Sequence, residues 1–111
     1  MQTLLYVAFL KLEALDLYKK FIAEIMGPRN REYKELLKRY GIRTTKVWYK
    51  KVADRDVVMV MHEAEDDALE RSEDWESSTH PFDHWFEERL NQCYETFSEP
   101  ADVLFQFDAM T

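Results

Sequence analysis

Residues 3–11 read Thr-Leu-Leu-Tyr-Val-Ala-Phe-Leu-Lys, and this stretch is apolar on both sides of an extended strand. Its apolar residues fall into two alternating sets, Leu5, Val7 and Phe9 on one side and Leu4, Tyr6, Ala8 and Leu10 on the other. A strand with two apolar sides has to be covered on both. The rest of the chain can cover one side of this strand, and the other side needs a further cover.

The stretch that follows predicts two helices. Apolar residues recur at i, i+3, i+7 and i+10 in Leu15, Tyr18, Ile22 and Ile25, which is typical of an amphipathic helix over residues 13–26. Gly27-Pro28 ends this helix, since proline cannot continue it. Pro28 also suits the first turn of a second helix, which Gly41 terminates.

The remaining chain predicts three strands and more helix. We expect strands at 43–52 and 57–64 around a turn at 53–56, a short helix in 65–76, a loop at 77–81, a helix from Phe82 to about Phe97, and a final strand Val103–Phe107. The order β-α-(α)-β-β-α-β is that of an α+β, ferredoxin-like split βαβ fold. Such a fold has a four-stranded antiparallel sheet with helices on one face. We expect residues 1–111 to form a single domain of this type.

The open face of this sheet predicts a dimer. If Val57 pairs with Val52, then Trp48, Met59 and Met61 share one face, and Glu63 stands opposite Lys46 on it. A face with a tryptophan and two methionines is unfavourable in water. Pairing two such sheets face to face would bury it, so we predict a homodimeric α/β barrel.

Composition excludes several classes. The 111 residues carry a formal net charge of −7, which argues against nucleic-acid binding. The short apolar start has no basic residues before it and cannot span a bilayer, so we expect neither a targeting segment nor membrane attachment. The single Cys93 fits a reducing compartment, and we expect a cytoplasmic protein. With two glycines and no phosphate-binding loop, we expect no cofactor.

The charge is unevenly distributed. Residues 29–55 carry ten basic against three acidic side chains, whereas residues 56–111 carry sixteen acidic against two basic ones. Two interpretations remain open. One is that the two regions are solvated faces that attract one another within the fold or across a dimer, and the other is that residues 29–55 form a basic opening that draws in an anion.

Several motifs carry a resemblance to a known group. They are Gly27-Pro28-Arg29, Tyr33, Tyr40-Gly41-Ile42, Val47-Trp48 and His80-Pro81-Phe82-Asp83-His84-Trp85-Phe86. With the element order, they make residues 5–95 resemble an uncharacterised bacterial family of the dimeric α/β-barrel (ferredoxin-like) superfamily. That superfamily includes cofactor-free monooxygenases, isomerases and haem-handling proteins. The resemblance implies the fold and the dimer but no particular activity. The chain departs from the family pattern at Phe9, where members usually carry an arginine, and this favours an apolar cavity over a charged role there.

Titratable residues offer few candidates for chemistry. His80 and His84 stand four apart, but Pro81 separates them, so we expect no metal site and assign Asp83 and Glu87 to stabilising the helix start. His62 and Glu63 are the catalytic candidates, as a general base. The alternatives are a satisfied core histidine for His62 and a cross-strand ion pair with Lys46 for Glu63. Cys93 lies in an apolar helical stripe and is interpreted as packing rather than as a nucleophile.

Aromatic and methionine side chains provide the candidate ligand site. Its expected residues are Phe9, Trp48, Met59, Met61 and Phe105 along the sheet, with Arg29, Tyr33 and Trp85 closing one end. We predict that they hold a small apolar or amphipathic carboxylate, fatty-acid-like or aromatic, against the sheet, either between the two sheets or between sheet and helices. Two alternatives remain: a cofactor-independent monooxygenase- or isomerase-like enzyme that uses Glu63 or His62, and a structural dimer that holds no ligand.

Overall fold

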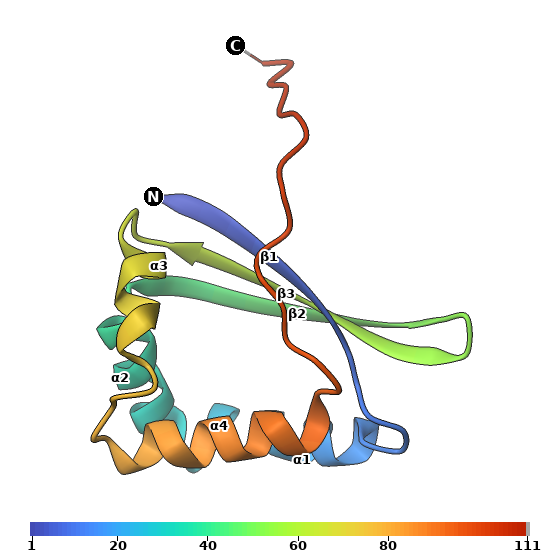
Figure 1. Ribbon diagram of the computed structural model, residues 1–111, viewed down its shortest axis with the longest axis vertical. Helices are drawn as coiled ribbons and strands as arrows, with labels where there is room; N and C mark the ends of the chain where they lie inside the picture. The colour runs from blue at the N-terminus through green and yellow to red at the C-terminus, as the bar shows by residue number, and fades with distance from the viewer. Residues whose placement is uncertain (111) are drawn as a thin grey trace.

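The computed structural model describes residues 1–110 and shows an antiparallel sheet with helices on one face (Figure 1). Strands β1 (Gln2–Phe9), β2 (Ile42–Val52) and β3 (Arg55–Ala64) are arranged in the order β1-β3-β2. The helices are α1 (Leu15–Met26), α2 (Asn30–Arg39), α3 (Ala68–Arg71) and α4 (Pro81–Cys93), and a 3₁₀ turn spans Ser72–Asp74. None of the helices in this part of the chain is both long and apolar enough to cross a bilayer.

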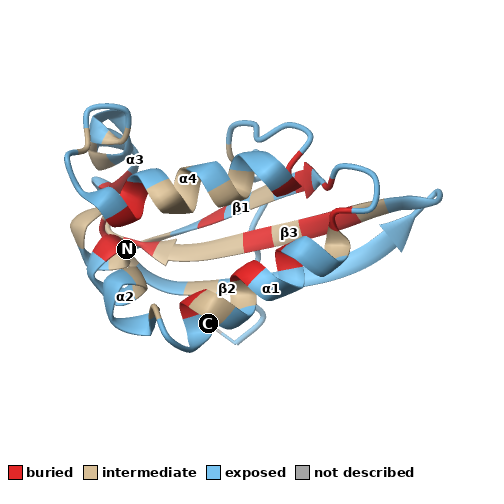
Figure 2. Cartoon of the chain, turned by 90° about the horizontal axis from the view of Figure 1, so that it is seen from below, coloured by how far each residue is buried: buried red, intermediate tan, exposed pale blue. Residues whose placement is uncertain are grey.

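The core lies between the sheet and helices α1, α2 and α4. Alternation along the strands directs Ala8 and Val58 toward the helices, where both are almost fully buried. Helix α1 buries Tyr18, Phe21 and Ile25, which follow one another at helical spacing. Figure 2 shows buried segments on β1, β3 and the helices, whereas β2 is exposed over most of its length. The helices therefore cover only one face of the sheet.

The predicted helix ends are close to those observed. Helix α2 ends at Arg39, and Gly41 follows with φ +71°, a left-handed conformation that glycine adopts without steric cost. Pro81 opens α4, where its missing N–H leaves no intrahelical bond unmade. Helix α4 ends at Cys93 rather than near Phe97, because Tyr94 turns to extended backbone and bridges to Leu10.

The β2–β3 turn is shorter than predicted, and the predicted register is wrong. Ala53 and Asp54 alone form the turn, with φ values of 49° and 63°. Trp48 therefore pairs with Met59, and Glu63 pairs with Thr44 instead of Lys46. The shift is two residues, which returns every side chain to the same face. Trp48, Met59 and Met61 consequently do share the face that the helices leave open, as predicted.

The expected fourth strand is not present within residues 1–110. The sheet has three strands, and residues 103–107 are irregular and exposed instead of forming a strand. After Tyr94 the backbone touches the outer edge of β1 at two points: Glu95 N–H donates to Phe9 O at 2.9 Å, and Ala101 N–H donates to Leu5 O at 2.7 Å. Beyond Ala101 the chain leaves the sheet (Figure 1). A strand needs a neighbouring strand for its ladder of hydrogen bonds, and residues 103–107 no longer lie along the edge of β1.

Candidate ligand-binding site

A cavity of about 110 Å³ lies between the covered face of the sheet and the helices. We call it the inner cavity. Its lining residues come from five elements and the segment after α4: Tyr18, Phe21, Ile22, Ile25, Tyr33, Leu36, Leu37, Ile42, Thr45, Val47, Val60, His62, Phe86, Leu90, Tyr94 and Phe97. Most are aliphatic or aromatic, which is typical of a small-molecule pocket with a few polar groups.

Two larger openings adjoin the inner cavity. One, of about 560 Å³, shares Tyr33, Leu37 and Ile42 with it. The other, of about 670 Å³, shares seven residues with it, among them His62, Tyr94 and Phe97. An elongated molecule could therefore place one end in the inner cavity and extend toward solvent.

The two openings carry opposite charges. The first is lined by Lys34, Lys38, Arg43 and Arg71, with Glu65 as the acid among them, and we call it the basic opening. Arg43 forms an ion pair with Glu65 at 2.8 Å, and Arg71 forms one with Asp67 at 3.0 Å. Lys34 and Lys38 form no ion pair with a carboxylate within residues 1–110. The second, the acidic opening, contains Glu76, Glu87, Glu95 and Glu99. An anion would be attracted to the basic opening and repelled from the other.

Two polar side chains stand next to each other on the sheet floor of the inner cavity. Thr45 on β2 and His62 on β3 are cross-strand partners, and both line the cavity. Thr45 Oγ1 is buried and forms no hydrogen bond of good geometry within residues 1–110, although the Tyr33 side chain lies close enough to interact with it. A buried hydroxyl without a partner is unfavourable by roughly 1–3 kcal/mol, so it marks a place where a ligand could supply the missing bond.

His62 is held as a neutral imidazole by its surroundings. Burial lowers its pKa from the usual 6.5, because desolvation penalises the charged ring. Tyr6 stacks at a tilt against it, with 5.4 Å between the ring centroids. A neutral imidazole in an apolar cavity can accept a proton or a hydrogen bond from a bound molecule.

Three phenols complete the polar inventory of the inner cavity. The Tyr18 and Tyr94 hydroxyls lie 2.8 Å apart and form one hydrogen bond. Burial raises the pKa of Tyr94 and of Tyr18, so both stay protonated at neutral pH. Burial also raises the pKa of Tyr33, an effect that the neighbouring Thr45 hydroxyl opposes. The cavity thus offers hydroxyl and imidazole groups but no charged side chain.

Of the eight residues expected to hold a ligand, only Tyr33 lines the inner cavity. Phe9, Trp48, Met59 and Met61 lie on the open face of the sheet, because strand alternation places them opposite to His62 and Thr45. Phe105 lies in the segment beyond the sheet and is 83% exposed. The same alternation separates the two catalytic candidates: His62 faces the cavity, and Glu63 faces away from it.

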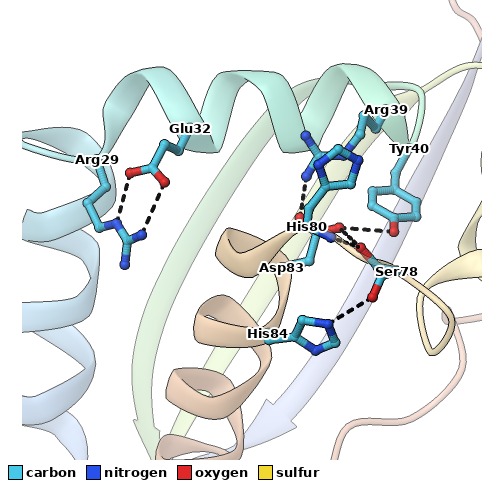
Figure 3. Close-up of polar contacts among 8 residues, drawn as sticks. All are labelled: Arg29, Glu32, Arg39, Tyr40, Ser78, His80, Asp83 and His84. Carbon is cyan, nitrogen blue, oxygen red and sulfur yellow. Dashed lines mark hydrogen bonds and ion pairs between the residues drawn. The ribbon is translucent and has the colours of Figure 1, made fainter.

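Arg29 and Trp85 stand together, although not at an opening of the cavity. The Arg29 guanidinium lies 4.2 Å from the centroid of the Trp85 ring and 4.9 Å from that of Phe82. It also forms a two-pronged hydrogen bond with Glu32, at 3.0 and 3.1 Å (Figure 3). This arrangement ties the α1–α2 connection to α4 and explains the Gly-Pro-Arg turn as a structural element.

The His80–His84 region forms a structural cluster around Asp83 (Figure 3). Asp83 is almost fully buried and accepts hydrogen bonds from Arg39, Tyr40 and Ser78. The His84 ring bonds to the Ser78 carbonyl at 2.8 Å. Residues 1–110 contain no group of three or more His, Cys, Asp or Glu side chains placed to hold a metal ion. Asp83 therefore links α2, α4 and the loop before it, in addition to any effect on the helix dipole.

Sequence patterns identified His62 but not its partner Thr45 or the Tyr18–Tyr94 pair. Tyr18 belongs to the apolar stripe of α1 and is indistinguishable from core by spacing alone. The signal that was available for Thr45 is its place in the alternation of β2, on the same face as Val47. The observed register was needed to set it beside His62.

No family model matches the chain, and no curated protein matches it. Two solved structures resemble it over nearly its whole length. One is tetracenomycin F2 cyclase from Streptomyces glaucescens, a type-II polyketide cyclase: the TM-score is 0.68 and the identity 20%, over 98% of this chain and 99% of that one. The other is L-rhamnose mutarotase from Formosa agariphila: the TM-score is 0.64 and the identity 11%, over 97% and 100% of the two chains.

At these identities the likeness shows the fold alone. It supports the predicted α+β, ferredoxin-like fold of the protomer, with three strands in place of four. The sheet-and-helix arrangement of this chain is thus one that a cyclase and a mutarotase also have.

Proposed function

We propose that the chain forms a homodimer in which each protomer binds a small amphipathic carboxylate, fatty-acid-like or aromatic, between its sheet and its helices. The observation that carries this proposal is the buried Thr45 hydroxyl, which has no well-formed hydrogen bond within residues 1–110, beside the neutral His62 ring in a mainly apolar cavity. The two polar groups would hydrogen-bond the ligand, and the surrounding apolar side chains would bury it. The single, buried Cys93 fits a cytoplasmic location for this function.

The size and charge of the site define the ligand class further. An apolar cavity on the order of 150 Å³ accepts a benzene-sized molecule, so the inner cavity of about 110 Å³ suits one ring or a short acyl chain. A carboxylate attached to that group would point to the basic opening, where Lys34 and Lys38 have no competing ion pair among residues 1–110. The acidic opening would exclude it.

Calorimetric titration of the full chain with octanoate and with 1-octanol tests the proposal. We expect octanoate to bind at least about tenfold more tightly, since only the acid gains from the basic opening. Lys34→Gln with Lys38→Gln should remove most of this preference. Failure of octanoate, 1-octanol and benzoate to bind at millimolar concentration would overturn the proposal.

Thr45→Val and its matched control Thr44→Val test the carrying observation. Thr44 is the adjacent threonine, exposed on the opposite face of β2. We expect Thr45→Val to weaken octanoate binding about 3- to 10-fold, the usual worth of one hydrogen bond, and Thr44→Val to leave it unchanged. Thr45→Val should also raise the free energy of unfolding of the unliganded protein, because it removes a buried hydroxyl without a partner. A loss of stability together with unchanged binding would show that Thr45 is structural.

The second candidate function is a cofactor-independent enzyme with His62 as general base. The lowered pKa of His62 favours it, since a neutral imidazole is the form that removes a proton. Both structural neighbours are named as enzymes, a cyclase and a mutarotase. Turnover of quinol-type or lactone substrates that is lost in His62→Gln and kept in Glu63→Gln would establish it, because the two residues face opposite sides of β3. Octanoate binding without turnover of these substrates would favour the binding function over the enzymatic one.

A further inference from the structure

The basic opening carries more positive charge than one carboxylate can balance. Of its described lining residues, four are basic and one, Glu65, is acidic. Asp67 lies outside the lining and pairs with Arg71 at 3.0 Å. Four positive charges less these two negative ones leave an excess of two at the opening. A ligand with a single negative charge therefore leaves part of this excess without a counter-charge.

The two lysines are the unpaired part of this charge. Lys34 and Lys38 stand one turn apart on α2, so their side chains lie on the same side of the helix. Neither pairs with a carboxylate of residues 1–110, whereas Arg31 on the same helix pairs with Glu35. Like charges at this spacing repel one another. An anionic group bound between them would replace this repulsion by attraction to the ligand.

The two arginines of the opening use only part of their hydrogen-bonding capacity. Arg43 donates through Nε to Glu65 at 2.8 Å. Arg71 donates through Nε to Asp67 at 3.0 Å. The terminal nitrogens of both guanidinium groups form no hydrogen bond with residues 1–110, so their N–H donors face the opening without a protein partner. Such donors suit the several oxygens of a phosphate or of a pair of carboxylates.

Gly41 allows Arg71 to reach the opening. Its φ is +71°, and its carbonyl accepts a hydrogen bond from the Glu65 N–H at 2.7 Å. A Cβ atom at position 41 would lie only 3.1 Å from Arg71 Nη1 and 3.3 Å from Arg71 Cζ. The guanidinium therefore packs directly on the backbone at Gly41, between α3 and the start of β2. A cation held in this way is preorganised to bind a head group.

The apolar part of the ligand determines where both charges lie. The basic opening meets the inner cavity at Tyr33, Leu37 and Ile42. The lining of the inner cavity contains no charged side chain, and the acidic opening that also adjoins it contains four glutamates. A negative charge on the tail of the ligand would be buried without a partner or placed against these glutamates, and both are unfavourable. Both charges therefore belong to the same end of the ligand.

We propose that the ligand is an amphipathic dianion with both negative charges on one head group, as in an alkyl-substituted dicarboxylate or a phosphate monoester. The head group lies among the two lysines of α2 and the two arginines, and the apolar tail enters the inner cavity. This inference rests on the proposed binding function and specifies the head group of its ligand.

Calorimetric titration with four probes tests the number and the position of the charges. Octanoate has one charge, octylsuccinate and octyl phosphate have two at one end, and suberate has one at each end. At pH 7.5, where octyl phosphate is largely dianionic, we expect at least one of the two dianionic head groups to bind at least about tenfold more tightly than octanoate. Suberate should bind no more tightly than octanoate. The tighter of octylsuccinate and octyl phosphate distinguishes a dicarboxylate from a phosphate ester.

Variants of the opening show whether this preference is local. Lys34→Gln with Lys38→Gln should reduce the advantage of the tighter dianion over octanoate to within about threefold, and Arg71→Gln should reduce it as well. Arg31→Gln with Lys20→Gln is the matched control, since it removes two positive charges from exposed positions that do not line the opening. The control should keep the full advantage. All these side chains lie at least partly at the surface, so circular dichroism should show an unchanged fold.

The outcomes separate this inference from the function on which it rests. Octanoate binding that neither dianion exceeds, or suberate binding as tight as that of the dianions, would overturn the inference and leave the proposed function in place. An equal loss in the control would overturn it too, because the preference would then be a long-range effect of net charge. Failure of all four probes to bind would overturn the inference, and with failure of 1-octanol and benzoate it would overturn the proposed function as well.

Discussion

At the scale of the residue, Asp83 and Thr45 show two fates of a buried polar group. Asp83 receives three hydrogen bonds, from Arg39 of α2, from Tyr40 directly after that helix and from Ser78 in the loop before α4, so the cost of burying its charge is offset. Thr45 Oγ1 receives none within residues 1–110. Asp83 is therefore expected to stabilise the fold, and Thr45 is expected to hydrogen-bond a ligand.

Replacing Asp83 by Asn should lower the free energy of unfolding by about 2–3 kcal/mol. The change removes the charge that Arg39 pairs with while keeping the shape of the side chain. Breaking a buried pair usually costs about 3–5 kcal/mol, and the partial exposure of Arg39 reduces this. Urea denaturation measures the difference, with Glu88→Gln, an exposed acid of the same helix, as the control. Equal losses in the two variants would contradict the role of Asp83.

The lowered pKa of His62 predicts a pH dependence of stability. The unfolded chain protonates this residue near its ordinary pKa of 6.5, while the folded chain does so only at lower pH. The unfolded state therefore binds more protons below about pH 6.5, and stability falls as the pH falls toward the folded-state pKa. The free energy of unfolding, measured from pH 7.5 to 5, should decrease more in the wild type than in His62→Gln. Parallel curves would show that burial does not hinder protonation.

At the scale of the element, the β2–β3 turn stores backbone strain. Ala53 and Asp54 both have positive φ, a conformation that costs a non-glycine residue about 1–2 kcal/mol. Asn-Gly is the preferred pair for such a two-residue turn. We expect Ala53→Asn with Asp54→Gly to raise the free energy of unfolding by about 1 kcal/mol, and Ala53→Val to lower it. Thermal and urea denaturation check both, and a destabilised Asn-Gly variant would contradict this turn geometry.

Most elements could be predicted from the sequence because their signals are local. The stripe of α1, the Gly41 stop and the Pro81 start each depend on neighbouring residues, and the helices are observed near the predicted places. The β2–β3 turn was predicted too long, since Asp56 resembles a turn residue and is in fact the second residue of β3. The side of the sheet on which each side chain lies was nevertheless predicted correctly, because the error in register was an even number of residues.

At the scale of the whole molecule, the open face predicts how the proposed dimer responds to mutation. Leu5, Val7, Phe9 and Trp48 remain 39–46% exposed on this face. We expect Trp48→Ala to raise the dimer dissociation constant at least about tenfold, while octanoate affinity per protomer stays unchanged. Leu12→Ala provides the control, since Leu12 is 93% exposed outside the sheet. Analytical ultracentrifugation measures the dimer, and a Trp48→Ala dimer as tight as the wild type would argue against pairing of the open faces.

The sequence by itself determined the helices, three of the four predicted strands and the two faces of the sheet, because helical and strand periodicities act over a few residues. It pointed to the first strand, apolar on both sides, and to an unpaired face that carries Trp48, Met59 and Met61. Only the tertiary structure decided that the cavity lies on the other face, where Thr45 meets His62 and Tyr18 meets Tyr94. Those pairs join residues 17 and 76 positions apart, and contacts at such separations depend on register and on how helices pack. The same holds for Val103–Phe107, whose pattern predicts a strand but whose backbone forms no β-ladder within residues 1–110.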